Sequence, residues 1–380
     1  MGYRWEKSQE RERFGGYPHV YDDILSGEAY SDLLDKGLLN KYNTVLMLSI
    51  DGAQLYQHKK SDCWIYIWLI VDLGPDKRYK IRNILLGGII PSPDPPDNLD
   101  SFLFPGLAHV SALQREGLYI WDAYKRRRAL SFIFLLLILA DAVVMAQLSG
   151  SVGHHGRKGC QLLCGFPGRN KIQGAHYYPA LLCPNGFEHH RTSSHEDVDI
   201  HLLPVANPKE YRRDLYHVVS SQSEAEYKWC WFNTGIGKPS IFDGIPRILD
   251  LPTCFPGNLM HQPLINLATL LIDLWCSRPG THDYDHSHWP WATLTGDVWV
   301  KHGKVVGDAA RYLPTSFGRA PRNPQEKISS GYKAWEFLYY IYGEGPGVLY
   351  SVLPEPYFSH FCKLVQAIRI IYQHTIQKNS

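Results

Sequence analysis

An apolar run from Ala129 to Ala146, ALSFIFLLLILADAVVMA, constrains the fold of this chain more than any other segment. It follows the basic sequence KRRR, so a hydropathy window alone marks it as a membrane helix. Asp141 interrupts the run well short of the roughly 20 apolar residues that a membrane helix needs. A carboxylate in mid-span is also disfavoured by about 2.5–3.5 kcal/mol. We therefore expect no membrane partner, and instead a buried central strand that ends at Asp141.

Three further strand-like segments precede this run. They are Thr44–Asp51 (TVLMLSID), Cys63–Leu73 and Tyr79–Ile90, and a helix is predicted over Phe102–Ile120. The order is thus three strands, a helix and a buried strand, with acidic residues ending the first and fourth strands. This order favours an α/β fold with a mixed sheet of the ribonuclease-H-like kind.

The rest of the chain alternates between loop-like and helical patterns. Residues 148–205 are rich in Gly, His and Pro and predict loops, whereas residues 206–315 carry apolar residues at helical spacing. Two more helices are predicted over Tyr332–Tyr342 and Tyr357–His374. The sequence GEGPG and a proline-containing turn are expected to separate them.

Two aspartates stand where chemistry on phosphodiesters would place them. Such chemistry suits divalent cations held by about three carboxylates that converge from distant parts of the chain. Asp51 and Asp141 each follow a strongly apolar, strand-like run. Single carboxylates at strand ends are common, so the placement alone is weak evidence for a metal site.

Longer stretches of sequence carry a family resemblance. Asn43–Tyr124 resembles the first half of the catalytic core of CACTA-type transposases, especially the fungal Plavaka-like branch. The matching words are SIDGAQLYQHKKSDCWIYIWLIVDLGPDKRYK, LDSFLFPGL and ALQREGLYIWDA, followed by LADAVVMAQLSGSVGHHGRKGCQLLCGFPGR and HYYPALLCP. TGIGKPSIF, CFPGNLMH, LLIDLW, GDVWVKHGK and SGYKAWEFLYYIYGEGPGVLY continue the likeness in order. It covers nearly all of residues 43–375.

The resemblance implies a metal-dependent DNA transposase with a ribonuclease-H-like fold and three catalytic carboxylates that bind Mg²⁺ or Mn²⁺. Asp51 in IDG matches the first and Asp141 in ADA matches the second. Glu336 in YKAWEF best matches the third, because its word falls on a predicted helix after a helical insertion. Glu344 is the competitor in a turn-like stretch, and Glu355 lies between two prolines.

The same resemblance implies a division of the chain into four parts. These are an N-terminal lead-in (1–40), the first part of the core (41–190) with a Cys/His loop at 150–190, a mostly helical insertion (191–325) and C-terminal helices that complete the core (326–380).

The Cys/His loop contains a candidate zinc site. Cys160 and Cys164 are spaced C-x3-C, and thiolates with imidazole suit a structural zinc ion. The resemblance implies Cys160, Cys164 and His176 as ligands, with Cys183 and His155 as candidates for a fourth. The alternative is a pair of free thiols packed in a loop. The polar N-terminus, MGYRWEKSQERERF, predicts no secretory leader, so we expect reduced thiols.

DNA contacts are less visible in the sequence, because the formal net charge is only +2. The candidate phosphate-binding cluster is Lys125, Arg126, Arg127 and Arg128, which immediately precedes the strand that leads to Asp141. The alternative for such a cluster is a solvated surface. DNA as substrate implies a nuclear location, and transposases generally self-associate on paired ends.

One departure from the family pattern supports a second interpretation. The family usually carries an acidic residue and a His in the word that matches NLMH, but here the acidic position is Asn258, which leaves the role of His261 in doubt. The alternative function is therefore a catalytically inactive or truncated, transposase-derived DNA-binding protein. All three matched carboxylates are present, which favours the enzyme.

Overall fold

The computed structural model describes residues 2–54, 62–91, 96–123, 126–170, 174–183, 196–278 and 289–377. The chain divides into two compact units, Met1–Gly257 and Asn258–Ser380, and each is described by itself. The boundary falls within residues 191–325, the segment predicted as one helical insertion.

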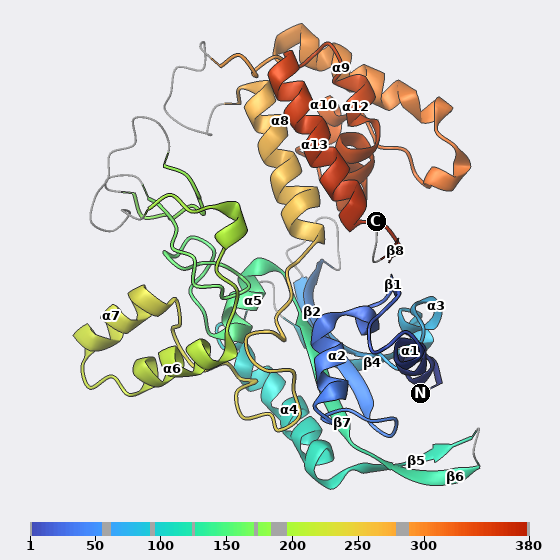
Figure 1. Cartoon of the computed structure of the whole chain (residues 1–380). Helices are drawn as coiled ribbons and strands as arrows, with labels where there is room; N and C mark the ends of the chain where they lie inside the picture. The colour runs from blue at the N-terminus through green and yellow to red at the C-terminus, as the bar shows by residue number, and fades with distance from the viewer. Residues whose placement is uncertain are drawn as a thin grey trace. The chain divides into compact units, whose positions relative to one another are not determined.

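A mixed sheet forms the centre of the first unit (Figure 1). Its four strands are β2 (Thr44–Gln54), β3 (Asp62–Ile70), β4 (Ile84–Pro91) and β7 (Ile133–Leu139). The spatial order is β4-β3-β2-β7, with β3 antiparallel to both of its neighbours and β7 parallel to β2. The predicted mixed α/β architecture is confirmed.

The two parallel strands are apolar because they lie in the middle of the core. Val45 and Leu48 of β2 are fully buried, as are Leu135 and Ile138 of β7. A strand covered on both faces carries a continuous apolar run rather than an alternating one. This explains why both segments were recognisable in the sequence.

The prediction of one strand ending at Asp141 was wrong at its beginning. β6 (Arg127–Ser131) is a separate strand that pairs with β5 (Leu118–Asp122) in a two-stranded hairpin, and β7 begins only at Ile133. The arginines that open β6 are exposed and cannot enter a strand buried on both faces. The chain therefore changes sheet at Phe132.

The helix predicted over Phe102–Ile120 was also wrong at its end. α4 (Leu99–Glu116) stops where Gly117 adopts a φ of 77°, a conformation that favours glycine, and Leu118 then starts β5. Similarly, Ile81–Asn83 is a short 3₁₀ turn (η2), so the third strand begins at Ile84 rather than at Tyr79.

The remaining elements of the first unit are short. They are α1 (Gly2–Arg13), β1 (Val20–Tyr21), η1 (Ile24–Ser26), α2 (Glu28–Asp35), α3 (Pro75–Arg78), α5 (Ala142–Ser149), η3 (Ile200–Leu202), α6 (Pro208–Val219) and α7 (Glu224–Thr234). Residues around Ile248 extend the sheet on the outer side of β7. There the backbone N–H of Leu135 donates to Arg247 O at 2.9 Å, and Leu249 N–H donates to Leu135 O at 3.0 Å.

A buried ion pair fixes the N-terminal helix to the sheet. Arg4 and Asp72 are almost completely buried, and Arg4 Nε lies 2.7 Å from Asp72 Oδ1. Arg4 also donates to the hydroxyl of Tyr30 and to the carbonyl of Asn43, while Asp72 Oδ2 accepts the N–H of Val45 at 2.8 Å. The segment predicted as a polar lead-in is thus part of the first unit's core.

The second unit is helical. Its elements are η4 (Met260–Leu267), α8 (Ala268–Cys276), α9 (Gly296–Ala309), η6 (Ala310–Tyr312), η7 (Thr315–Phe317), α10 (Pro324–Lys327), α11 (Ala334–Phe337), η8 (Leu338–Glu344), α12 (Gly345–Val348), α13 (Glu355–Ile371) and the short strand β8 (Ile376–Gln377). Ile272, Val306, Tyr340 and Leu349 are fully buried in its core.

The turn predicted at GEGPG is wrong, because η8 continues directly into α12. Pro346 lies at the second position of α12, directly after the π-helical segment η8. Within the described residues, no helix has the length and apolar character needed to cross a membrane.

Candidate functional site

Asp51 and Asp141 lie at the same end of neighbouring strands. In the parallel pairing of β2 with β7, Ser49 is the register partner of Leu139. Asp51 lies two residues further along β2, which continues to Gln54, and Asp141 lies two residues beyond the end of β7. Adjacent strands are about 4.8 Å apart, and residues at matching positions share a face of the sheet. The register therefore brings two carboxylates that are far apart in sequence to one edge of the sheet.

Asp141 has a second role as the N-cap of α5. Its Oδ1 accepts the backbone N–H of Val144 at 2.8 Å, as expected for an aspartate at a helix start. Asp51 is exposed, whereas Asp141 is half-buried. Two carboxylates at one strand end provide hard oxygen ligands for a divalent cation such as Mg²⁺. Their donor atoms therefore suit the metal that the sequence resemblance implies.

Glu336 lies in the second unit and is fully engaged by other groups. Its side chain is completely buried, and Arg322 binds it through Nε to Oε1 and through Nη2 to Oε2, each at 2.7 Å. The backbone N–H groups of Arg322 and Lys333 also donate to the carboxylate. Burial opposes its ionisation, but these donors outweigh burial and lower the pKa of Glu336 below its usual value.

Glu344, the competing carboxylate, has the opposite surroundings. Both of its oxygens are buried, and neither has a hydrogen-bond partner among the described residues. Burial raises the pKa of Glu344 to about 7. It ends η8, a π-helical segment of the kind that often occurs at functional sites. Glu355, the third alternative, is exposed at the start of α13. Of these three glutamates, Glu344 is the one whose buried oxygens lack a ligand.

The candidate zinc ligands do not converge. The thiols of Cys160 and Cys164 contact each other, and the hydrogen bond from Cys164 lowers the pKa of Cys160 to about 6 while raising that of Cys164. The ring of His176 instead stacks on that of His155, with centroids 4.0 Å apart. Cys183 donates its backbone N–H to Asp197. Across the described ranges, no group of three or more His, Cys, Asp or Glu side chains is arranged to hold a metal.

The basic cluster lies at the tip of the β5–β6 hairpin. Arg127 and Arg128 are exposed, Arg126 has a positive φ of 47°, and Lys125 lies outside the described residues. β6 leads into the beginning of β7, whereas Asp141 follows the end of β7. Figure 1 shows the hairpin extending away from the four-stranded sheet. The arginines are therefore separated from Asp141 by the length of β7.

Asn258 caps the helical start of the second unit. Its Oδ1 accepts the backbone N–H groups of Met260 and His261, at 3.1 and 3.0 Å. An asparagine performs this capping as well as an aspartate does. The Nδ1 atom of His261 is buried without a partner in the part of the chain that is described. The amide that departs from the family pattern thus has a structural use.

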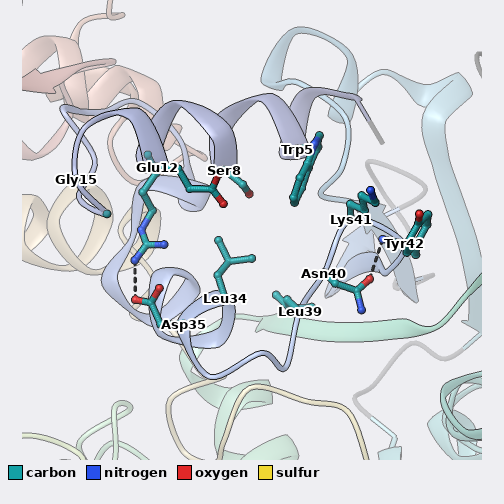
Figure 2. Close-up of a pocket in the computed structure, with 12 residues that line it drawn as sticks. Trp5, Ser8, Glu12, Gly15, Leu34, Asp35, Leu39, Asn40, Lys41 and Tyr42 are labelled. Atoms are coloured by element: carbon teal, nitrogen blue, oxygen red, sulfur yellow. Dashed lines mark hydrogen bonds and ion pairs between the residues drawn. The ribbon is translucent and has the colours of Figure 1, made fainter.

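A hollow of about 700 Å³ between α1 and α2 is a weaker candidate for a functional site (Figure 2). Trp5, Leu34 and Leu39 provide apolar walls, and Figure 2 marks an ion pair to Asp35. The partner is Arg11, whose Nη2 lies 2.6 Å from Asp35 Oδ2. Arg11, Glu12, Asp35 and Lys41 bring charges of both signs to the lining, so the hollow favours neither an anionic nor a cationic ligand.

Neither the family models nor the curated proteins contain a match to this chain. The functional assignment therefore depends on the geometry of the two units and on the sequence resemblance. Asp51 and Asp141 stay predicted metal ligands, and the preference for Glu336 was made without any sign in the sequence of its partner Arg322. The partner is one of many arginines in the chain, and no local spacing rule points to it.

Proposed function

We propose that this chain is the catalytic core of a DDE-type DNA transposase that resembles the CACTA group. The proposed reaction cleaves phosphodiester bonds at transposon ends and joins the freed 3′-hydroxyl to target DNA. The observation that carries the proposal is the parallel register of β2 and β7, whose last pair, Ser49 and Leu139, lies two residues before Asp51 and Asp141. The ordered sequence words that surround both aspartates support the same function.

The proposal includes a ribonuclease-H-like core. Three consecutive antiparallel strands, β2, β3 and β4, are followed after a helix by β7, which returns parallel to β2. The parallel bridge between Leu135 and Ile248 adds a fifth segment beyond β7. This arrangement supports the ribonuclease-H-like assignment by its strand order and direction.

Asp51 and Asp141 would hold Mg²⁺ or Mn²⁺. When bound, such ions activate the attacking oxygen and stabilise the leaving oxygen. The N-cap hydrogen bond from Val144 fixes the orientation of the Asp141 carboxylate through its Oδ1. The exposure of Asp51 leaves its carboxylate accessible to a DNA substrate.

The proposed mechanism includes a third metal-binding carboxylate. The sequence resemblance assigns this role to Glu336, whose oxygens are bound by Arg322. The unpartnered oxygens of Glu344 make it the competing ligand. Replacing each glutamate by glutamine separates these two assignments, because only the true ligand is needed for metal-dependent cleavage.

Further parts of the proposal concern partners and location. The exposed arginines of the β5–β6 hairpin would contact DNA phosphates away from the cleavage site. Self-association on paired transposon ends and a nuclear location follow from the proposed substrate. The structural zinc remains a proposal that would require Cys160, Cys164 and His176 to come together on metal binding.

A second candidate function is a transposase-derived DNA-binding protein without catalysis. The engagement of Glu336 by Arg322 favours it, since a carboxylate with both oxygens bound cannot also ligate a metal without losing these contacts. This function predicts DNA binding that is unaffected by loss of Asp51.

Metal-dependent nicking of a duplex that carries the transposon end tests the enzyme. The purified full chain is expected to nick it with Mg²⁺ or Mn²⁺, and Asp51→Asn or Asp141→Asn should abolish nicking. Asp76→Asn, at an exposed position of α3 in the same unit, is the matched control and should retain activity. Equal activity in Asp51→Asn and the unmodified chain would overturn the proposal, whereas metal-independent binding without nicking would favour the second function.

A further inference from the structure

A second hollow in the first unit is lined by aromatic and basic side chains. It has a volume of about 610 Å³ and is bounded by α5, by the loop at 152–158 and by the end of α7. We call it the aromatic–basic pocket. Its principal side chains are those of Tyr177, Trp231, Phe232, Arg157 and Lys158. Pockets of about 300–1,000 Å³ are of the size that takes small organic ligands.

The aromatic walls offer ring faces and edges. Trp231 is 41% exposed although it lines the pocket, so a large part of its indole is available to a ligand. The rings of Tyr177 and Phe232 meet edge to face at 6.3 Å and 71°. Planar ligands stack on such side chains, and every nucleobase has a face that allows this.

The basic side chains lie against these rings. The guanidinium of Arg157 is 4.8 Å from the ring centre of Phe232, and its Nη1 donates to Asn233 Oδ1 at 3.0 Å. Its Nε is buried and has no hydrogen-bond partner within the described residues. The positive charge of Arg157 in the pocket lining favours an anionic ligand, because charge-assisted hydrogen bonds to a phosphate are strong.

Lys158 adds a second positive charge. Burial lowers the pKa of Lys158, and Asp214 and Glu210 of α6 partly offset this effect, while Arg157 and Arg213 add to it. His154 and His155 also line the pocket, whereas none of its described lining residues is acidic. The lining as a whole therefore complements a ligand that is both planar and negatively charged.

The position of the pocket connects it to the candidate metal site. Val143 and Ala146 of α5 form part of its wall, and the N-cap of the same helix is Asp141. A nucleotide in the pocket would thus lie beside the helix that orients one of the two aspartates.

We infer that the aromatic–basic pocket binds a single unstacked nucleotide of a DNA strand, with its base against Trp231 and its phosphate at Arg157 and Lys158. The identification of the ligand as DNA rests on the proposed function. The recognition itself requires neither a metal nor cleavage. The pocket thereby gives the first unit a contact for single-stranded DNA next to Asp141.

Fluorescence anisotropy with a labelled single-stranded oligonucleotide, measured on the full chain in EDTA, tests this inference. Trp231→Ala is expected to weaken binding about tenfold, the effect typical of one lost base stack, and Trp231→Phe should restore most of it. Lys158→Gln should weaken binding and reduce its dependence on salt. The matched control is Trp229→Ala, since Trp229 is 67% exposed on the same helix and does not line the pocket.

Equal affinity of Trp231→Ala and the unmodified chain would overturn the inference, as would equal losses in the Trp229 and Trp231 variants. Because Trp231 is partly exposed, its variant should fold, and thermal unfolding verifies this. If a deoxynucleoside monophosphate displaces the oligonucleotide at concentrations as low as those at which the oligonucleotide itself binds, the ligand is a free nucleotide rather than DNA. Asp51→Asn separates the two proposals, since it should bind the oligonucleotide normally even where cleavage is absent.

Discussion

Glu336 and Arg322 form a bidentate ion pair in which each carboxylate oxygen accepts one guanidinium N–H at 2.7 Å. The pair links the start of α11 to the segment before α10, and the carboxylate also accepts the backbone N–H of Lys333. This relationship makes Glu336 a structural group of the second unit, whatever its part in metal binding. Because Glu344 has no such partner among the described residues, replacing each glutamate should have a different effect on stability.

Loss of this ion pair should destabilise the second unit. Glu336→Gln is expected to lower the free energy of unfolding by about 2 kcal/mol, less than the usual value for a fully buried pair because Arg322 is partly exposed. Urea unfolding of the full chain measures the effect. Glu326→Gln is the control, because Glu326 is exposed in the same unit and glutamine keeps an oxygen that can accept from Asn323; it should change stability by less than about 0.5 kcal/mol.

The same pair predicts that the stability of the second unit decreases at acidic pH. The pKa of Glu336 is lowered in the folded chain, so its stabilising effect is present above the usual glutamate pKa and is lost as pH falls through the folded value. Below that pH, Glu336→Gln and the unmodified chain should unfold at similar urea concentrations. A difference that persists unchanged into strong acid would contradict this account.

Glu344 should show the reverse pH dependence. Its pKa rises from the ordinary value to about 7, so ionisation disfavours the folded state as pH increases through that interval. Glu344→Gln is therefore expected to be more stable than the unmodified chain at pH 8, by about 2 kcal/mol, and equally stable at pH 4. Thermal unfolding across this range measures it. If Glu344 is also the third metal ligand, the more stable variant will have lost metal-dependent cleavage.

The N-cap of α5 allows the two roles of Asp141 to be separated. Asp141→Asn retains a cap for Val144 and should leave stability nearly unchanged while abolishing cleavage. Asp141→Ala should additionally destabilise the first unit by about 1 kcal/mol. Urea unfolding of both variants, beside the nicking assay, distinguishes the effects. Equal stability of the two variants would show that the cap hydrogen bond contributes nothing.

The thiol pair makes a prediction about reactivity. Cys160 should react with iodoacetamide at pH 7 much faster than Cys254, because contact with Cys164 lowers the pKa of Cys160 to about 6 and burial raises that of Cys254. Cys164→Ala should slow alkylation of Cys160 by removing the donor. Mass spectrometry identifies the modified residue, and protection of both thiols by added Zn²⁺ would support the proposed zinc site.

The elements predicted best from the sequence are those that depend on a continuous local pattern of residues. Buried apolar runs identified β2 and β7, but β2 continues past Asp51 to Gln54, and Asp141 follows β7 by two residues. The split at Phe132 was missed, because an apolar run does not reveal that its exposed beginning pairs with another strand. Helix continuation through Pro346 was missed because proline lacks a backbone N–H and therefore normally predicts a break in a helix.

Side-chain partners over long distances could not be predicted. The pairing of Arg4 with Asp72 and of Arg322 with Glu336 depends on packing that no sequence spacing encodes. The aromatic–basic pocket was missed because its walls come from separate segments. One feature of the sequence does bear on the pocket. Trp229 and Trp231 are two positions apart in α7, so they cannot occupy the same face of a helix, and at most one of them could line a given pocket.

The parallel pairing of β2 with β7 also has a consequence for the order in which parts of this chain fold during synthesis. Parallel neighbours cannot be joined by a tight turn, so the hairpin formed by β2 and β3 can close long before β7 has been synthesised. Asp51 then has no companion until the segment ending at Asp141 docks beside it. An unfinished chain leaving the ribosome therefore lacks the pair of carboxylates, and the proposed metal site could form only once the sheet is complete.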